Sequence, residues 1–142
     1  MSEIERWLSM METEGGRLTA PRKTIVELLV ETDHALEPLE LFDLARKKYP
    51  RLGLMTVYRT LELLTNLKLI ERVHQADGCH TYLRAAQGHE HILLCTQCGK
   101  AQYFKGDDLG SLISGVRRDY GFKVQDHWLQ LQGVCSNCQG KS

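Results

Sequence analysis

The chain has 142 residues, the size of one ordinary domain or two small ones. With 42% hydrophobic residues, 25% charged residues and a formal net charge of zero, its composition is that of a soluble globular protein and does not by itself indicate nucleic-acid binding. No apolar run is long enough to cross a bilayer, and the acidic N-terminus has no signal-peptide pattern. We therefore expect a cytoplasmic protein, in which cysteines are more often metal ligands or reactive thiols than disulfides.

Apolar residues recur at helical spacing in the first half of the chain. The pattern predicts a helix over 3–13, a second helix that begins near Pro21, and a third that begins at Pro38 and ends before Pro50. A fourth helix is predicted over 54–67. Its predicted buried face is formed by Val57, Leu61 and Leu64.

Strand patterns follow at 69–74 and 79–83, joined by an Asp-Gly pair that favours a hairpin turn. Helices that lead into a hairpin are typical of a winged helix-turn-helix. Beyond it, strands are predicted on both sides of residues 95–98, an aspartate at 107 or 108 is expected to cap a helix, and 122–132 alternates as a long strand. The predicted architecture is α+β, with a winged-helix domain over 1–84, a hinge over 85–88 and a small α/β domain over 89–142.

Two Cys-x-x-Cys pairs give the strongest functional signal, Cys95 with Cys98 and Cys135 with Cys138. Four thiolates at this spacing form a closed tetrahedral site for zinc. A redox dithiol would instead need a strand-to-helix context, which neither pair has. We therefore predict a structural zinc that ties the last strand to the first strand of the second domain, so that loss of the metal costs folding.

Positive charge is concentrated locally in the first half. Five cations and no acidic residue lie between Leu44 and Leu61, and a second basic cluster lies at the start of the second helix. The fourth helix would enter the major groove, where Arg59 suits guanine and Tyr58 suits a thymine methyl group. The alternative is a solvated cationic face with Tyr58 as packing. The candidate DNA contacts are Arg17, Arg22, Lys23, Thr56, Tyr58 and Arg59.

A second metal site is predicted upstream of the cysteine cage. His89 and His91 are two residues apart, so both rings lie on one side of an extended segment, and Cys79 on the hairpin is able to face them. A thiolate with imidazoles favours zinc over iron(II) or manganese. The alternatives are ordinary surface histidines and a small buried cysteine. The open candidates are Glu71 or His34 as the fourth ligand, and His127 with Asp108 or Asp107 as an accessory site.

Together these residues resemble the ferric uptake regulator family of metal-dependent repressors. The resemblance rests on residues 17–22 (Arg-Leu-Thr-Ala-Pro-Arg), 55–60 (Met-Thr-Val-Tyr-Arg-Thr), 89–99 and 133–138. It implies a winged-helix domain, a hinge and a dimerisation domain with structural zinc, in a homodimer that binds palindromic operator DNA when a regulatory metal is bound. It also implies DNA reading by Tyr58 and Arg59, a hinge site with His34, His89 and His91, and an accessory site with His127.

The chain also departs from the family pattern. The family places two residues between its last histidine and the first cysteine, but three residues separate His91 from Cys95, through either a bulge or a change in which histidine ligates. This chain has no acidic residue at three positions where iron-type members carry one, which weakens the iron, manganese and peroxide-sensing alternatives. These positions are Leu83, Tyr103 and Gly110. The presence of Cys79 instead strengthens the zinc-sensing alternative.

We therefore predict a homodimeric, zinc-responsive repressor of double-stranded operator DNA that is not an enzyme and has no membrane partner. Zinc at the hinge would fix the separation of two recognition helices, and the metal-free protein would lose affinity as its domain angles spread. Iron(II) or manganese at the hinge, a peroxide-responsive regulator and a protein-binding zinc module are the alternatives. A zinc hydrolase with Glu90 as base is a further alternative, although the helical His-Glu-x-x-His spacing is missing.

Overall fold

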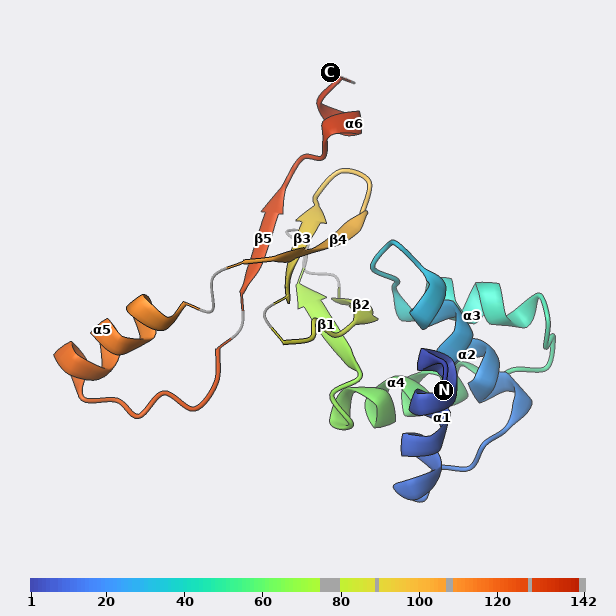
Figure 1. Cartoon of the computed structure of the whole chain (residues 1–142). Helices are drawn as coiled ribbons and strands as arrows, with labels where there is room; N and C mark the ends of the chain where they lie inside the picture. Colours follow the sequence, from blue (N-terminus) through green and yellow to red (C-terminus); the bar gives the residue numbers. More distant parts are fainter. Residues whose placement is uncertain (75–79, 89, 107–108, 128, 141–142) are drawn as a thin grey trace. The chain divides into compact units, whose positions relative to one another are not determined.

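The computed structural model describes residues 1–74, 80–88, 90–106, 109–127 and 129–140 (Figure 1). It contains two compact units, Met1–Ala85 and Ala86–Ser142. Helices dominate the first unit and a small sheet the second, so the predicted α+β class is confirmed. No helix among these residues is both long and apolar enough to cross a membrane.

Local sequence signals determine where the helices of the first unit begin. The hydroxyl of Ser2 accepts the Glu5 N–H at 3.1 Å, and the Glu5 carboxylate accepts the Ser2 N–H at 3.1 Å, so the first helix starts with a capping box. Thr19 caps the second helix by accepting the Arg22 N–H at 3.4 Å, with Pro21 in the first turn. The helices are α1 (Glu3–Thr13), α2 (Ala20–Glu31), α3 (Pro38–Arg46) and α4 (Leu54–Asn66).

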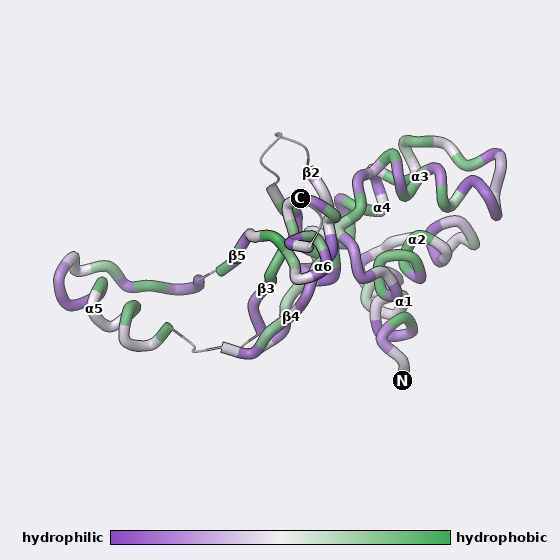
Figure 2. The backbone as a smooth tube through the Cα atoms, turned by 90° about the horizontal axis from the view of Figure 1, so that it is seen from above, coloured by the Kyte–Doolittle hydropathy of each residue, from purple (hydrophilic) through white to green (hydrophobic). Residues whose placement is uncertain are grey.

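The helices bury one shared apolar core. Trp7 and Met11 of α1 are fully buried, as is Leu29 of α2. The predicted inward face of α4 is buried as well, and Figure 2 shows hydrophobic and hydrophilic positions alternating along these helices. Every buried member of this core belongs to the first unit. Burial of this apolar surface is the main term that holds α4 in place.

Strands β1 (Ile70–His74) and β2 (His80–Arg84) form an antiparallel hairpin. Leu36, in the segment before α3, adds a short bridge through two backbone hydrogen bonds with Tyr82, at 2.8 and 2.9 Å. The hairpin is therefore attached to the helices on one side. The predicted Asp-Gly turn and Cys79 lie outside the described residues.

The second unit has a three-stranded sheet in the order β4-β3-β5. The central strand pairs antiparallel with β4 and parallel with β5 (Figure 1). Ile92 and Leu94 of the central strand are each 1% exposed, which makes it the most buried element of the sheet. The elements are β3 (Glu90–Cys95), β4 (Ala101–Lys105), α5 (Gly110–Tyr120), β5 (Gln130–Gly133) and α6 (Ser136–Gln139).

Two sequence predictions for this unit are wrong. The predicted strand over 122–132 is a strand only from Gln130 onward, because pairing with β3 starts at Ile92 with Gln130 and 122–127 has no ladder partner. The predicted aspartate cap of α5 is also wrong, since its N-cap is Leu109, in a left-handed conformation (φ 61°) and with no side-chain cap hydrogen bond.

Candidate functional site

The four paired cysteines converge on one point of the second unit. Their sulfur atoms all lie within 4.8 Å of one another. The Cys95 and Cys138 sulfurs are 3.9 Å apart, and the Cys98 and Cys135 sulfurs are 3.8 Å apart. Four sulfurs at about 2.3 Å from a tetrahedral zinc would be about 3.8 Å from one another. The two sulfur–sulfur distances therefore match a tetrahedral zinc site, and the cluster as a whole could hold a zinc ion.

Turns at the ends of the strands position these sulfurs. Cys95 ends β3, and its carbonyl accepts the Gly99 N–H at 3.0 Å, which closes the turn that contains Cys98. Gly99 has a φ of 78°, a conformation that favours glycine. The Thr96 N–H donates to the Gly133 carbonyl at 2.8 Å and so joins this turn to the end of β5. The ladder and the two turns thus bring both pairs together.

Backbone N–H groups stabilise the Cys95 thiolate. The Cys135 N–H donates to the Cys95 sulfur at 3.3 Å and the Cys98 N–H donates to it at 3.5 Å, and these bonds lower the pKa of Cys95 to about 6. The pKa of Cys135 is also lowered, first by backbone hydrogen bonding with Cys138. Bonding to the Cys135 sulfur raises the pKa of Cys138 to about 12. Local geometry therefore favours thiolate at two of the four ligands.

Acid should release the metal from this cluster. In the metal-free cluster the lowered pKa of Cys95 means that its thiolate is present above pH 6 and is protonated as the pH falls through about 6. We expect one zinc per cluster to be retained at pH 7.5 and released only at a pH below the Cys95 pKa of about 6, because bound zinc competes with protons for the four thiolates. A chromophoric chelator at stepped pH measures this. Zinc that is still fully retained in strong acid, where all four thiols are protonated, would contradict thiolate ligation.

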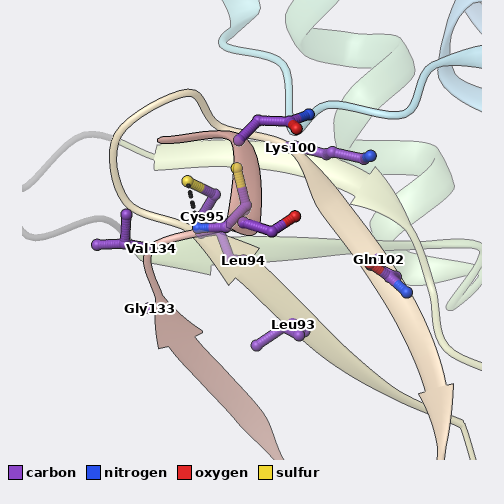
Figure 3. Close-up of a pocket in the computed structure, with 10 residues that line it drawn as sticks. Leu93, Leu94, Cys95, Lys100, Gln102, Gly133 and Val134 are labelled. Carbon is purple, nitrogen blue, oxygen red and sulfur yellow. Dashed lines mark hydrogen bonds between the residues drawn. The ribbon is translucent and has the colours of Figure 1, made fainter. Parts of the chain in front are cut away.

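A cavity of about 250 Å³ adjoins the cluster, and its wall includes Cys95 and Cys135. Figure 3 shows Gly133 and Val134 on the β5 side of this cavity and Lys100 and Gln102 on the β4 side. Because two cluster cysteines line it, this cavity is part of the candidate metal centre.

His91 lies at the other end of β3 and is 5% exposed. Its ring centroid is 5.5 Å from that of Phe104 and 6.3 Å from that of His127. A Cβ atom at Gly106 would lie 3.0 Å from the His91 Cδ2 atom, so glycine gives the ring its space. His91 and His127 therefore lie close enough to bind the same metal ion if their rings reorient.

The pairing between β3 and β4 bears on the extra residue between His91 and Cys95. The register runs without interruption from Glu90 with Lys105 to Leu94 with Ala101, so this ladder does not contain the bulge, which was one of the two alternatives for the extra residue before Cys95. Because β-strand side chains alternate, His91 and Cys95 lie on the same face of the sheet. With the family's spacing of two intervening residues, the histidine and the cysteine would lie on opposite faces of the strand. The extra residue in this chain therefore places His91 on the same face as Cys95.

The other predicted ligands lie in the first unit or outside the described residues. The His34 Nδ1 atom pairs with the Asp33 carboxylate, and Glu71 is half-buried on β1. Leu83, on β2, is 2% exposed. The hinge and accessory ligand sets stay predictions. Outside the described residues lie Cys79, His89, Asp107 and Asp108.

A cleft of about 800 Å³ opens at the start of α4. Four of the six predicted DNA contacts line it, whereas Lys23 and Tyr58 do not, and Tyr58 is 44% exposed. Lys48 and Arg51 line it too, although sequence reasoning counted them only as local charge. The four predicted contacts that line it are Arg17, Arg22, Thr56 and Arg59.

Comparison with known proteins agrees with this architecture. The family model described as "Ferric uptake regulator family" matches residues 13–132. The ferric uptake regulation protein of Bacillus subtilis (strain 168) is 38% identical over 146 residues, covering 99% of this chain and 97% of that protein. The zinc uptake regulation protein of Mycobacterium tuberculosis is 31% identical over 129 residues, covering 91% and 99%. The structure of the Helicobacter pylori ferric uptake regulator superposes with a TM-score of 0.75 at 23% identity, covering 97% and 95%, which shows a shared fold.

Proposed function

Because the chain belongs to the ferric uptake regulator family of metal-responsive transcription regulators, we propose that it is a homodimeric repressor that binds operator DNA when zinc is bound. Members of this family bind operator DNA as dimers and are not enzymes, so the hydrolase alternative is set aside. The observation that carries the zinc-binding part of this proposal is the four-sulfur cluster, whose spacing fits zinc.

Two kinds of zinc site have different roles in this proposal. The cysteine cage holds a structural ion that stabilises the second unit. A second, exchangeable ion at the hinge sets the relative position of the two recognition helices of the dimer. The division of the chain between Ala85 and Ala86 supports a hinge at 85–88. The proposed hinge ligands are Cys79, His89 and His91, with Glu71 or His34.

Zinc selectivity rests on the missing oxygen ligands. Leu83 occupies the hairpin position where iron-type members carry an acidic residue, and its side chain is 2% exposed. It cannot supply an oxygen ligand, so the thiolate of Cys79 and the imidazoles of His89 and His91 dominate the proposed hinge site, a set that suits zinc. The closeness of His91 and His127, at 6.3 Å between ring centroids, supports an accessory site that includes Asp108.

An iron-responsive regulator is the second candidate. Identity of 38% with the Bacillus subtilis protein, which is named for ferric uptake, favours it. Sequence identity of this size shows family membership, whereas the metal that is bound depends on a few ligand residues. Direct metal titration separates the two candidates.

The test loads zinc or iron(II) anaerobically into protein whose exchangeable metal has been removed and whose cysteine cage is intact. Fluorescence anisotropy then measures affinity for an operator duplex selected from a random pool by the metal-loaded protein. We expect zinc to raise affinity by about 10- to 100-fold, a coupling typical of allosteric sites. Equal affinity with and without metal rejects the switch, and a larger gain with iron(II) favours the second candidate.

Replacing the buried His91 with alanine should abolish most of this zinc-dependent gain while the cage keeps its ion. His80→Ala is the matched control, because His80 is exposed on β2 and is not among the proposed ligands. Zinc content, measured by atomic absorption, distinguishes loss of the exchangeable ion from unfolding. A normal response in His91→Ala would remove His91 from the hinge site.

A further inference from the structure

The cleft at the start of α4 is positively charged on all its walls. Three segments line it: the stretch 17–22, the loop between α3 and α4, and α4 itself. Five of its lining residues are cations and none is a carboxylate. No ion pair among the described residues joins any of these cations to an acid. The cleft is therefore a site for a polyanion.

The loop between α3 and α4 is held firmly in place. Tyr49 packs against the core of the first unit, and Leu52 is 8% exposed. The Tyr49 N–H donates to the Ala45 carbonyl at 2.9 Å, and the Leu52 N–H donates to the Tyr49 carbonyl at 2.9 Å. The backbone of this loop is therefore in place before a ligand binds, which reduces the entropy lost in ordering the loop on binding.

The cations of this loop differ in what they contact. Lys48 lies with its Nζ atom 5.9 Å from the centre of the Tyr49 ring, at the cleft, and Arg51 lines the same cleft. Arg46 instead lies over the ring of Phe42, at 5.0 Å. Lys47 is exposed and does not line the cleft.

The opposite wall is also built in advance. The Arg22 Nη1 atom donates to the Arg17 carbonyl at 3.1 Å, which holds the guanidinium beside the turn before α2. The hydroxyl of Thr19 accepts the Arg22 N–H at 3.4 Å. Cations on the two walls thus face a shared space, the arrangement expected for gripping a phosphodiester backbone that passes between them.

We propose that Lys48 and Arg51 bind the sugar-phosphate backbone of duplex DNA, so that this loop sets affinity and salt dependence while α4 reads the bases. The proposal rests on the proposed function as a DNA-binding regulator. Phosphate contacts position a protein on a duplex and carry no sequence information directly. Lys48 and Arg51 therefore act equally on operator and non-operator DNA.

The experiment uses full-length, zinc-loaded protein and the single substitutions Lys48→Ala, Arg51→Ala and Lys47→Ala. Anisotropy titrations on the selected operator and on a scrambled duplex are repeated at several KCl concentrations. Each removed phosphate contact should make the negative slope of log K against log salt shallower by about 0.9, or by about 1.8 for a dimer that carries the substitution twice. We expect this change for Lys48→Ala and Arg51→Ala on both duplexes, with the ratio of operator to scrambled affinity unchanged.

Lys47→Ala is the matched control, since it removes the same charge from the neighbouring position outside the cleft. An unchanged slope for Lys48→Ala and Arg51→Ala, an equal change for Lys47→Ala, or a changed affinity ratio overturns the proposal. Thermal melting checks that all variants remain folded. If wild-type protein binds the operator equally well without metal while the salt slopes of Lys48→Ala and Arg51→Ala change as expected, the metal switch is rejected and the cleft assignment stands. If wild-type protein binds no DNA, both the proposed function and the cleft assignment are rejected.

Discussion

Replacing Cys98 with serine should remove one zinc ion per chain and unfold the second unit. The side chain of Cys98 is exposed, so the substitution removes little packing and its effect comes from the lost ligand. Three remaining sulfurs leave an incomplete cage. The apparent binding free energy of structural zinc in small folds is about 10–16 kcal/mol at pH 7, and it is coupled to folding. The expected result is that this unit loses its cooperative unfolding transition. Circular dichroism and limited proteolysis measure this loss.

The second unit depends on this ion because it has little else to hold it together. Its buried apolar residues are concentrated on β3, and α5 buries none of its described side chains. The two turns of the cage join the ends of β3 and β5, which are otherwise linked through a ladder of only four residue pairs. Loss of the ion therefore separates the strands that form the centre of the sheet.

Gln97→Ala is the control for this substitution, because Gln97 is exposed in the same turn and offers no sulfur. It should keep its zinc and its melting transition. The first unit should also remain folded in Cys98→Ser, since the helical core contains no residue of the second unit. A Cys98→Ser protein with full zinc content and unchanged proteolysis would show that the cage is not structural.

The helices were predictable because their signals are local. The first helix was predicted over 3–13 and forms at Glu3–Thr13, and the fourth was predicted over 54–67 and forms at Leu54–Asn66. In both, apolar spacing is contained in the segment itself. The alternation over 122–132 is equally local, but a strand also needs a neighbouring ladder, and β3 offers one only from Ile92 onward. The sequence of a segment does not show whether a neighbouring strand is present to pair with it.

The same distinction applies to the sites. Cysteine spacing predicts the cage because each pair lies within one turn, so each supplies two ligands to the same point. The cleft is different, since its walls come from segments that the fold brings together. Lys47 and Lys48 are equivalent in sequence, and only the loop between α3 and α4 distinguishes the one that lines the cleft.

Replacing Leu61 with alanine should destabilise the first unit by about 2–5 kcal/mol, the usual cost of a buried leucine-to-alanine change. Leu61 is 1% exposed and belongs to the core that anchors α4. Urea denaturation measures the change, with Glu62→Ala, an exposed neighbour on the same helix, as the control. Zinc in the cysteine cage should be unaffected, because the four sulfurs lie in the other unit.

DNA binding should fall in Leu61→Ala only as far as the folded fraction falls. The folded molecules keep every cation of the cleft, so the slope of log K against log salt should equal that of wild type. This separates the anchoring of α4 from its contacts, because Lys48→Ala is expected to change the slope without changing stability. A destabilisation below about 1 kcal/mol would mean that the core relaxes around the lost side chain, and that α4 is held mainly by other contacts.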